Sequence, residues 1–224
     1  MKPLVLKVTG RVFYSEPELL AKLIHVVRGL SENYRIVIVA GGGGTARRYI
    51  TSAKSIGVSS NYWLDLIGIW ASRLNSLLLI SALQPYSYPK PAASLEEALE
   101  ALASSRIVVM GGLIPGQSTA SVAVEVAEAL SVSELYYLSA AGYVYDKDPA
   151  RYPDAKPLKE INASMLKEML RQKQLPGEYA LIDEKALDLA VRSNILIKLV
   201  DYREPEKLLE AIRGGNPGSM IHPC

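Results

Sequence analysis

Four consecutive glycines, Gly41 to Gly44, follow the apolar run "RIVIVA" (35–40) and precede two arginines, Arg47 and Arg48. Glycines that follow a buried strand let backbone N–H groups approach a ligand, because no Cβ stands in the way. The helix N-terminus that comes next adds partial positive charge, and guanidinium groups supply the forked donors that phosphate oxygens accept. The stretch therefore predicts a phosphate-binding loop, with an ordinary tight turn as the alternative.

Two further loops have the same character, "TGR" (9–11) and "GGLIPGQST" (111–119), and each follows an apolar run typical of a buried strand. In parallel sheets, ligands bind beyond the carboxyl ends of the strands, where such loops lie together. Lys7 stands in the first strand, and a buried lysine is costly unless an anion meets its ammonium group or that group reaches water. Together these features predict one anion site.

Two common phosphate motifs are absent or incomplete. No Gly-Lys-Ser/Thr sequence occurs, which excludes a Walker A loop. The dinucleotide fingerprint lacks its third glycine, because Arg47 stands at that position after Gly42 and Gly44. Asp65 lies at about the distance expected for a ribose-binding acid, so a dinucleotide-binding protein remains an alternative.

A later segment, "YVYDKDPARYPDAK" (143–156), offers two more candidates. The ring of Tyr145 could stack on a base, and the carboxylate of Asp148 could accept a hydrogen bond from a hydroxyl or amino group. The alternative for this segment is an ordinary Asp-Pro turn.

Strand and helix patterns alternate along the chain. Buried strands are expected at 4–10, 35–40, 106–112, 134–145 and 194–200, with a short strand at the end. Helices are expected from Ser15 to Leu30 and at 45–56, 62–83, 94–104, 118–130, 163–172, 183–192 and 205–212. Capping boxes are predicted at Ser15 with Glu18 and at Ser94 with Glu97. This order predicts an α/β fold whose mostly parallel sheet is covered on both faces.

Composition narrows the class of protein. The chain has 224 residues, 49% of them hydrophobic, which permits one large domain or two small lobes that meet near residues 130–135. With 25 Lys+Arg against 23 Asp+Glu, nothing global attracts nucleic acid or a membrane surface. Cys224 is the single cysteine and His25 and His222 are the two histidines, so neither an internal disulfide nor a zinc site is readable.

The longest apolar stretch, Leu64 to Leu83, contains Asp65, Arg73 and Asn75, which argues against a membrane span and favours an intracellular, cytoplasmic protein. Its helix carries a broad apolar stripe, which predicts either a core helix or a surface for self-association. The stripe consists of Trp63, Leu66, Ile67, Trp70, Leu74, Leu77 and Leu78.

The sequence resembles the amino acid kinase superfamily, and within it the archaeal type of uridylate (UMP) kinase. The resemblance rests on five stretches in that family's order and spacing, which span nearly the whole chain: "KVTGRVF", "GGGGTARRYI", "YWLDLIGIWASRLN", "GGLIPGQSTA" and "VYDKDPARYPDAK". It implies a single three-layer αβα domain over 1–224, with an acceptor lobe at about 1–132 and an ATP lobe at about 133–224. It also implies a homohexamer that transfers the γ-phosphoryl group of Mg-ATP to UMP.

The resemblance also implies roles for residues. Lys7 and Arg47 are expected to be catalytic, and Mg²⁺ is expected to arrive with ATP rather than on protein ligands. The expected ATP contacts are Lys7, Thr9, Gly10, Arg11, Gly43, Arg47, Ser139, Tyr145 and Asp148. The expected UMP contacts are Gly42, Asp65, Leu113, Ile114, Pro115, Gly116, Gln117, Ser118 and Thr119.

Two departures from the family pattern matter. Where the family usually reads Thr-Asn-Val-Asp-Gly-Val-Tyr, this chain reads "SAAGYVY", so that Gly142 replaces an aspartate and Ala140 an asparagine. A late helix has Asp188 where the family has a lysine, and Lys185 lies three residues earlier on nearly the same face, where it could substitute. A catalytically impaired or silent nucleotide-binding relative is therefore the alternative to an active kinase.

Overall fold

The computed structural model describes residues 1–149, 151–171 and 182–224. Its centre is a seven-stranded sheet, whose strands lie in the spatial order β3 (Ile107–Met110), β2 (Tyr34–Ala40), β1 (Lys2–Val8), β4 (Glu134–Ser139), β8 (Leu196–Asp201), β9 (Met220–His222) and β7 (Glu160–Asn162). The first five strands in this order run parallel, and β9 runs antiparallel to β8. The predicted mostly parallel sheet is confirmed.

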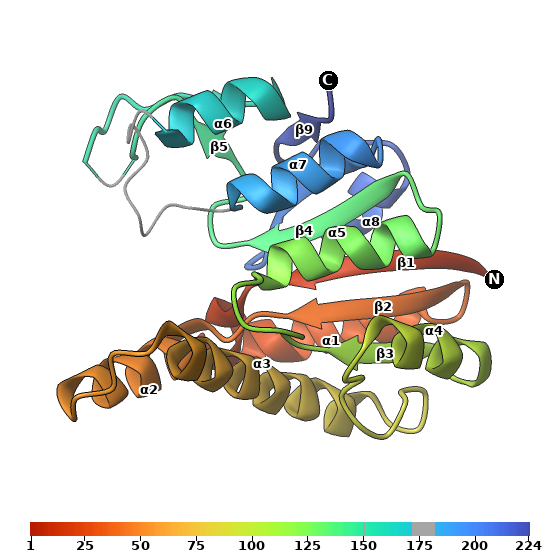
Figure 1. Cartoon of the computed structure of the whole chain (residues 1–224). Helices are drawn as coiled ribbons and strands as arrows, with labels where there is room; N and C mark the ends of the chain where they lie inside the picture. The colour runs from red at the N-terminus through yellow and green to blue at the C-terminus, as the bar shows by residue number, and fades with distance from the viewer. Residues whose placement is uncertain (150, 172–181) are drawn as a thin grey trace.

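Helices cover both faces of the sheet (Figure 1). One face is covered by α4 (Leu95–Ser104), α5 (Thr119–Ala129), α6 (Ala163–Arg171) and α7 (Glu184–Arg192), whose buried residues join one apolar core. The other face is covered by α1 (Pro17–Leu30), α3 (Asn61–Leu83) and α8 (Lys207–Ile212), which contribute to a second core. The expected three-layer αβα arrangement is confirmed.

The central strand β1 serves both cores. Val5 packs in the core beneath α5, whereas Leu4 and Leu6 pack in the core beneath α1 and α3. Successive side chains of a strand point to opposite faces, so an apolar run without polar breaks suits a strand that is buried on both sides. Lys7 interrupts this run and is itself only 2% exposed.

The expected strand at 134–145 is wrong in one respect, because it is two strands. β4 ends at Ser139, and β5 (Val144–Tyr145) forms a separate antiparallel pair with β6 (Pro157–Leu158). Gly142 lies between them with a φ of +64°, a left-handed conformation that turns the chain out of the main sheet.

The two predicted capping boxes have different outcomes. The N–H of Glu97 donates to Ser94 Oγ over 3.1 Å, so the cap of α4 is confirmed. The cap at Ser15 is wrong: α1 begins at Pro17 without a side-chain cap, and Ser15 Oγ instead donates to the carbonyl of Arg11. A proline at the first helical position has no N–H that needs an acceptor, which reduces the need for a cap.

Helix α2 (Gly43–Ser55) begins two residues earlier than predicted and packs against α3 and the short 3₁₀ helix η1 (Gly10–Tyr14). Helix α3 is long and apolar enough to cross a membrane by length and composition alone. Its inner face nevertheless lies in the core, through Leu79, Ile80 and Leu83. Its outer face exposes much of the predicted apolar stripe, at Trp63, Trp70, Leu74, Leu77 and Leu78.

Candidate functional site

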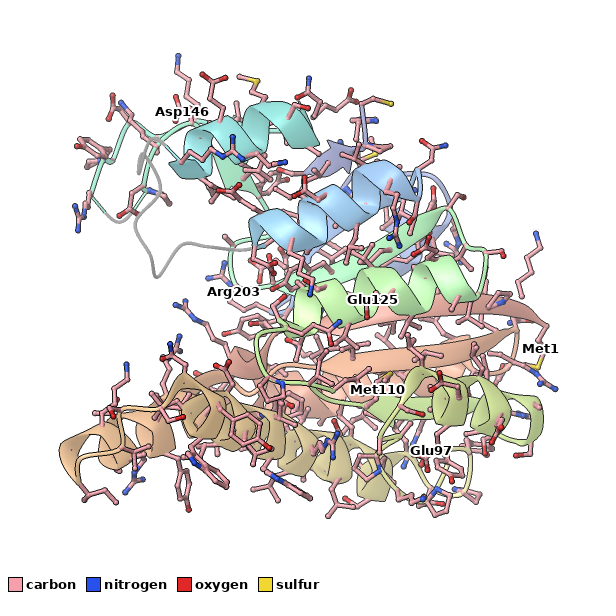
Figure 2. All side chains as sticks on the ribbon, viewed as in Figure 1. Met1, Glu97, Met110, Glu125, Asp146 and Arg203 are labelled. Carbon is pink, nitrogen blue, oxygen red and sulfur yellow. The ribbon has the colours of Figure 1, made fainter. Side chains whose placement is uncertain are left out.

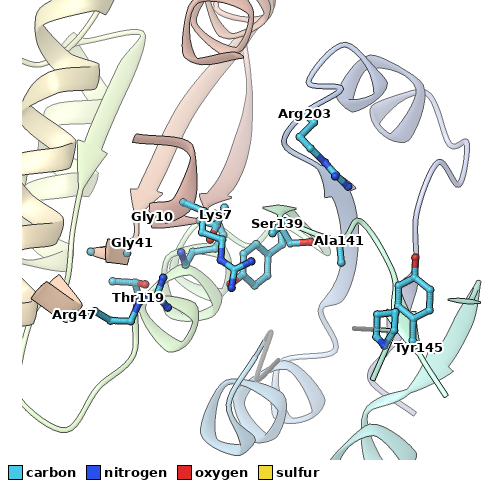
Figure 3. Close-up of a pocket in the computed structure, with 16 residues that line it drawn as sticks. Lys7, Gly10, Gly41, Arg47, Thr119, Ser139, Ala141, Tyr145 and Arg203 are labelled. Carbon is cyan, nitrogen blue, oxygen red and sulfur yellow. The ribbon is translucent and has the colours of Figure 1, made fainter. Parts of the chain in front are cut away.

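The loops at the carboxyl ends of β1, β2 and β4 converge with the N-terminus of α5 around a pocket of about 460 Å³. Its walls come from residues far apart in the sequence, as Figure 3 shows. They are Lys7, Thr9, Gly10, Arg11, Gly41, Gly42, Gly43, Arg47, Thr119, Tyr137, Ser139, Ala140, Ala141, Tyr145, Pro149 and Arg203. Two of the three predicted glycine loops, 9–11 and 41–44, therefore meet at the pocket, and the third, 111–119, reaches it through Thr119.

Two glycine loops touch each other through their backbones. A Cβ added to Gly10 would stand 2.2 Å from the backbone nitrogen of Gly43 and 2.8 Å from the carbonyl oxygen of Gly41. Gly43 itself has a φ of +57°, which side chains other than that of glycine rarely adopt. Glycine is thus required at both positions, and α2 begins at the pocket, where the N–H of Gly44 donates to the hydroxyl of Tyr14.

Polar side chains of α3 hold the other side of these loops. Asn75 Nδ2 donates to the carbonyl oxygens of Gly41 and Gly42, over 2.8 and 3.3 Å. Ser72 Oγ accepts from the N–H of Gly112 over 2.8 Å. Sequence reasoning missed both roles, although a buried Asn and Ser in an otherwise apolar helix is a signal that polar partners lie opposite.

Among the charged groups that line the pocket, Lys7 has the pKa that is shifted furthest from its usual value. Its Nζ donates to the carbonyl of Val8 over 3.0 Å and lies 5.1 Å from the centre of the Tyr137 ring. Burial lowers the pKa of Lys7 to about 7, because the charged form loses its hydration. Desolvation also raises the pKa of Tyr137, so the phenol stays neutral. A polyanion in the pocket would restore the charge on Lys7.

Arginines add positive charge around this lysine. Arg11 and Arg47 are exposed and line the pocket from η1 and α2, and Arg203 lines it from the turn after β8. The three guanidinium groups and Lys7 surround a space walled by backbone amides. Such an arrangement suits several phosphate groups bound at once.

The predicted acceptor residues form a loop beside the pocket. Asp65 Oδ2 accepts a hydrogen bond from the N–H of Gly116 over 2.8 Å, which joins α3 to the 113–119 loop. Arg73 Nε donates to the carbonyl of Gly112 over 3.2 Å. Within this loop Thr119 lines the pocket, whereas Asp65 and the residues 113–118 do not.

A serine-aspartate pair fixes the end of the acceptor loop. Ser118 Oγ accepts from the N–H of Ser121 and so caps α5, and the same hydroxyl donates to the carboxylate of Asp183. Asp183 in turn caps α7 by accepting from the N–H of Ala186 over 3.0 Å. Two helix N-termini therefore share one hydrogen-bond network. No local pattern in the sequence predicts that Asp183 would meet Ser118.

Of the residues predicted to contact the adenosine part of ATP, two line the pocket and one does not. Ser139 and Tyr145 line the pocket, and Tyr145 lies at the end away from Arg47, as Figure 3 shows. Asp148 does not line it: its carboxylate is buried within its turn, with Arg151 Nε 3.5 Å from Oδ2. Sequence reasoning missed Tyr137, Ala141 and Pro149 as lining residues.

The positions at which this chain departs from the family pattern, 140 and 142 on one side and 188 on the other, lie in different parts of the structure. Ala140 lines the pocket, whereas Gly142 does not, and a Cβ added at Gly142 would stand 3.0 Å from the backbone nitrogen of Asp201. Asp188 is exposed on α7 and pairs with Lys167. Lys185 is exposed and does not line the pocket, so the structure gives no support to its substituting for the family lysine.

Comparison with known proteins shows which family the chain belongs to. A family model described as the amino acid kinase family matches residues 2–201. The uridylate kinase of Staphylothermus marinus is 54% identical over 220 residues, which cover 98% of each chain. The uridylate kinase of Pyrobaculum aerophilum is 46% identical over 218 residues, covering 97% of this chain and 98% of that one.

Solved structures agree with the sequence matches. The uridylate kinase from Archaeoglobus fulgidus superposes with a TM-score of 0.86 at 32% identity, over 99% of this chain and 100% of that chain. The UMP kinase from Ureaplasma parvum, at 22% identity and a TM-score of 0.72, shares the fold over 99% of this chain and 98% of its own. The chain therefore belongs to the amino acid kinase family, and within it to the uridylate kinases.

Proposed function

We propose that the pocket binds ATP and UMP together and transfers the γ-phosphoryl group of ATP to UMP, giving UDP. The observation that carries this proposal is the position of Lys7, which is buried at a pocket lined by the 9–11 and 41–43 loops and by Thr119. A lysine with so little hydration gains most from a ligand that concentrates negative charge beside it. Two nucleotides whose phosphates meet there are such a ligand.

Phosphoryl transfer depends on positioning and charge neutralisation more than on a covalent participant. The ammonium group of Lys7 and the guanidinium group of Arg47 would bind the transferring group from two sides. The backbone N–H of Gly43, which lines the pocket, would donate to the phosphate oxygens. No side-chain nucleophile is needed, since the attacking oxygen belongs to the phosphate of UMP.

Magnesium would enter with ATP. Among the described residues, no group of three or more His, Cys, Asp or Glu side chains is placed to hold a metal ion. The cations and backbone amides at the pocket would hold the phosphate oxygens that carry this metal. When bound, Mg²⁺ would neutralise the phosphate charge and favour the in-line geometry.

ATP would occupy the pocket itself, and UMP would lie beside it, with its phosphate toward Thr119. For UMP we propose the 113–119 loop, Gly42 and Asp65, whose carboxylate would accept from ribose hydroxyls while holding Gly116. For ATP we propose Thr9, Gly10, Arg11 and the region of Ser139, Tyr145 and Asp148. This division follows the sheet, where β1 to β3 belong to the lobe at 1–132 and β4, β7, β8 and β9 to the lobe at 133–224.

For assembly we propose a homohexamer in the cytoplasm, where ATP and UMP are available. The support is the outer face of α3, where Trp70 is 61% exposed and Leu74 is 60% exposed. Large apolar side chains grouped on one exposed helix face commonly mark a protein interface. Covering them with a second copy would bury area worth about 25 cal/mol per Å².

The experiment that tests the function is a coupled assay with Mg-ATP and a panel of nucleoside monophosphates. UDP formation that is fastest with UMP supports the proposal. If both nucleotides bind, as measured by titration calorimetry, but no nucleoside diphosphate forms, the chain is a silent nucleotide-binding relative. If another monophosphate is the preferred acceptor, the assignment of UMP is wrong.

A further inference from the structure

The turn after β8 brings an arginine to the pocket. Arg203 lines the pocket at the end away from Arg47 and Thr119, as Figure 3 shows. In Figure 2 it lies at the edge of the sheet where the parallel strands end. Arg203 lies outside the five stretches that carry the resemblance to the family, so those stretches did not predict a role for it.

A carboxylate holds this guanidinium group in place. Arg203 Nε donates to Asp201 Oδ1 and Oδ2 over 2.9 and 3.0 Å, Nη2 donates to Oδ2, and the backbone N–H of Arg203 donates to Oδ1 over 2.9 Å. Asp201 is the last residue of β8 and stands in register with Ser139 of β4. The side chain of Asp201 is 15% exposed and that of Arg203 58% exposed. The arginine head is therefore anchored to the sheet yet open to the pocket.

Part of the guanidinium group is available to a ligand. The bonds to Asp201 use Nε and Nη2, and no hydrogen bond of Nη1 occurs within the described part of the chain. An arginine that is already oriented loses less side-chain freedom when it binds a phosphate. The pairing also raises the pKa of Arg203, chiefly through the hydrogen bonds to Asp201, so the group stays charged.

Arg203 is also the cation that the later half of the chain brings to the pocket. Among the described lining residues beyond position 132, it is the one with a positive charge. Position 188, where the family has a lysine, carries an aspartate that pairs with Lys167 on the surface. We propose that Arg203, held by Asp201, binds the phosphate chain of the donor nucleotide from the side opposite Arg47. This inference rests on the proposed function, because it presumes that the donor is a nucleoside triphosphate.

The test compares nucleotide binding in three variants. Arg203→Ala is expected to weaken Mg-ATP binding and raise the KM for ATP by about 10- to 100-fold, the range for a lost hydrogen bond to a charged group. The KM for UMP is expected to stay within about twofold, since the contact lies at the other end of the pocket. Arg192→Ala is the matched control, because Arg192 is 63% exposed and pairs with Glu128 away from the pocket. It is expected to leave both constants unchanged.

A double variant separates the arginine from its partner. Removing Arg203 alone leaves the Asp201 carboxylate facing the phosphates, whereas Asp201→Asn with Arg203→Ala removes that charge as well. If the double variant still binds ATP about tenfold or more weakly, the missing contact is the cause. If it recovers wild-type affinity, repulsion by Asp201 explained the loss and the inference is wrong.

The choice of ligand completes the test. AMP lacks the β- and γ-phosphates, so its affinity is expected to change much less than that of ATP in Arg203→Ala. An equal loss for AMP and ATP would overturn the assignment to the phosphate chain, and an unchanged ATP affinity would overturn the contact altogether. These binding measurements need no turnover. Absence of UDP formation by the wild type would therefore contradict the proposed function without deciding the role of Arg203.

Discussion

The Nζ of Lys7 lies 5.1 Å from the centre of the Tyr137 ring, and neighbouring strands place both residues in register. The ring and the strands exclude water from the ammonium group, which is the reason that its pKa falls to about 7. The free protein therefore holds this group partly deprotonated near neutral pH. Phosphate oxygens beside Nζ would favour the charged form and raise the pKa again.

The first prediction is that ATP binding takes up a proton at pH 8. At this pH the free Lys7 is mostly neutral, because the pH is above its pKa of about 7, and the nucleotide-bound Lys7 is expected to be charged. Titration calorimetry in buffers of different ionisation enthalpy measures the number of protons taken up. Lys7→Met is the control and should show a smaller uptake. Equal uptake by both proteins would show that Lys7 does not meet the phosphates.

The second prediction concerns the acceptor loop. Asp65→Ala should weaken UMP binding by about 1–3 kcal/mol, because it leaves Gly116 and the ribose hydroxyls without an acceptor. ATP affinity should barely change. Asp65→Asn keeps an oxygen for the Gly116 N–H but loses the second acceptor, so it should also bind UMP more weakly than the wild type. Wild-type UMP affinity in Asp65→Asn would mean that Asp65 only holds the loop.

The third prediction is that restoring the family aspartate at position 142 does not help. Gly142 has a φ of +64°, and an added Cβ would stand 3.1 Å from Asp201 Cβ. Gly142→Asp should therefore lower the free energy of unfolding by about 1–3 kcal/mol and leave turnover no higher, since strain and a second carboxylate are added together.

Gly57→Asp is the matched control for this change. Gly57 also has a positive φ, +93°, but an added Cβ would meet nothing within 4 Å. Thermal unfolding should show a smaller loss for Gly57→Asp than for Gly142→Asp. A faster Gly142→Asp enzyme of unchanged stability would refute this explanation of the departure.

The fourth prediction concerns assembly. Light scattering at micromolar concentration should give about six times the chain mass of 24.4 kDa. Leu74→Glu should dissociate the assembly, because a charge on the outer face of α3 is costly to bury. Ile56→Glu is the control, since Ile56 is 81% exposed beyond the end of α2. A wild-type monomer would rule out the hexamer.

The strands, the glycine loops and Lys7 could be predicted from the sequence because their signals are local. Apolar runs without polar breaks indicated strands buried on both faces, and glycines directly after them indicated loops at the carboxyl edge. The break between β4 and β5 was missed because an apolar pattern does not report the backbone angle of Gly142. The cap at Ser15 failed for a similar reason, since a matching pair of residues does not fix where the helix starts.

Contacts between distant segments could not be predicted in the same way. Arg203 reaches the pocket because β8 lies beside β4, and that neighbourhood depends on the order of strands in the sheet. Asp183 meets Ser118 only because α5 and α7 pack side by side. Asn75 stood out in an apolar helix, yet its partners, the carbonyls of Gly41 and Gly42, follow from packing alone.

The most direct test of the central claim is the rate of UDP formation from Mg-ATP and UMP by the wild type and by Lys7→Ala. Lys7 is placed to neutralise charge that develops on the transferring group, so the variant should turn over about 10²- to 10³-fold more slowly, as on loss of one preorganised donor. Its affinity for UMP should change little. Equal rates for the two proteins, or no UDP from a wild type that binds both nucleotides, would contradict the account.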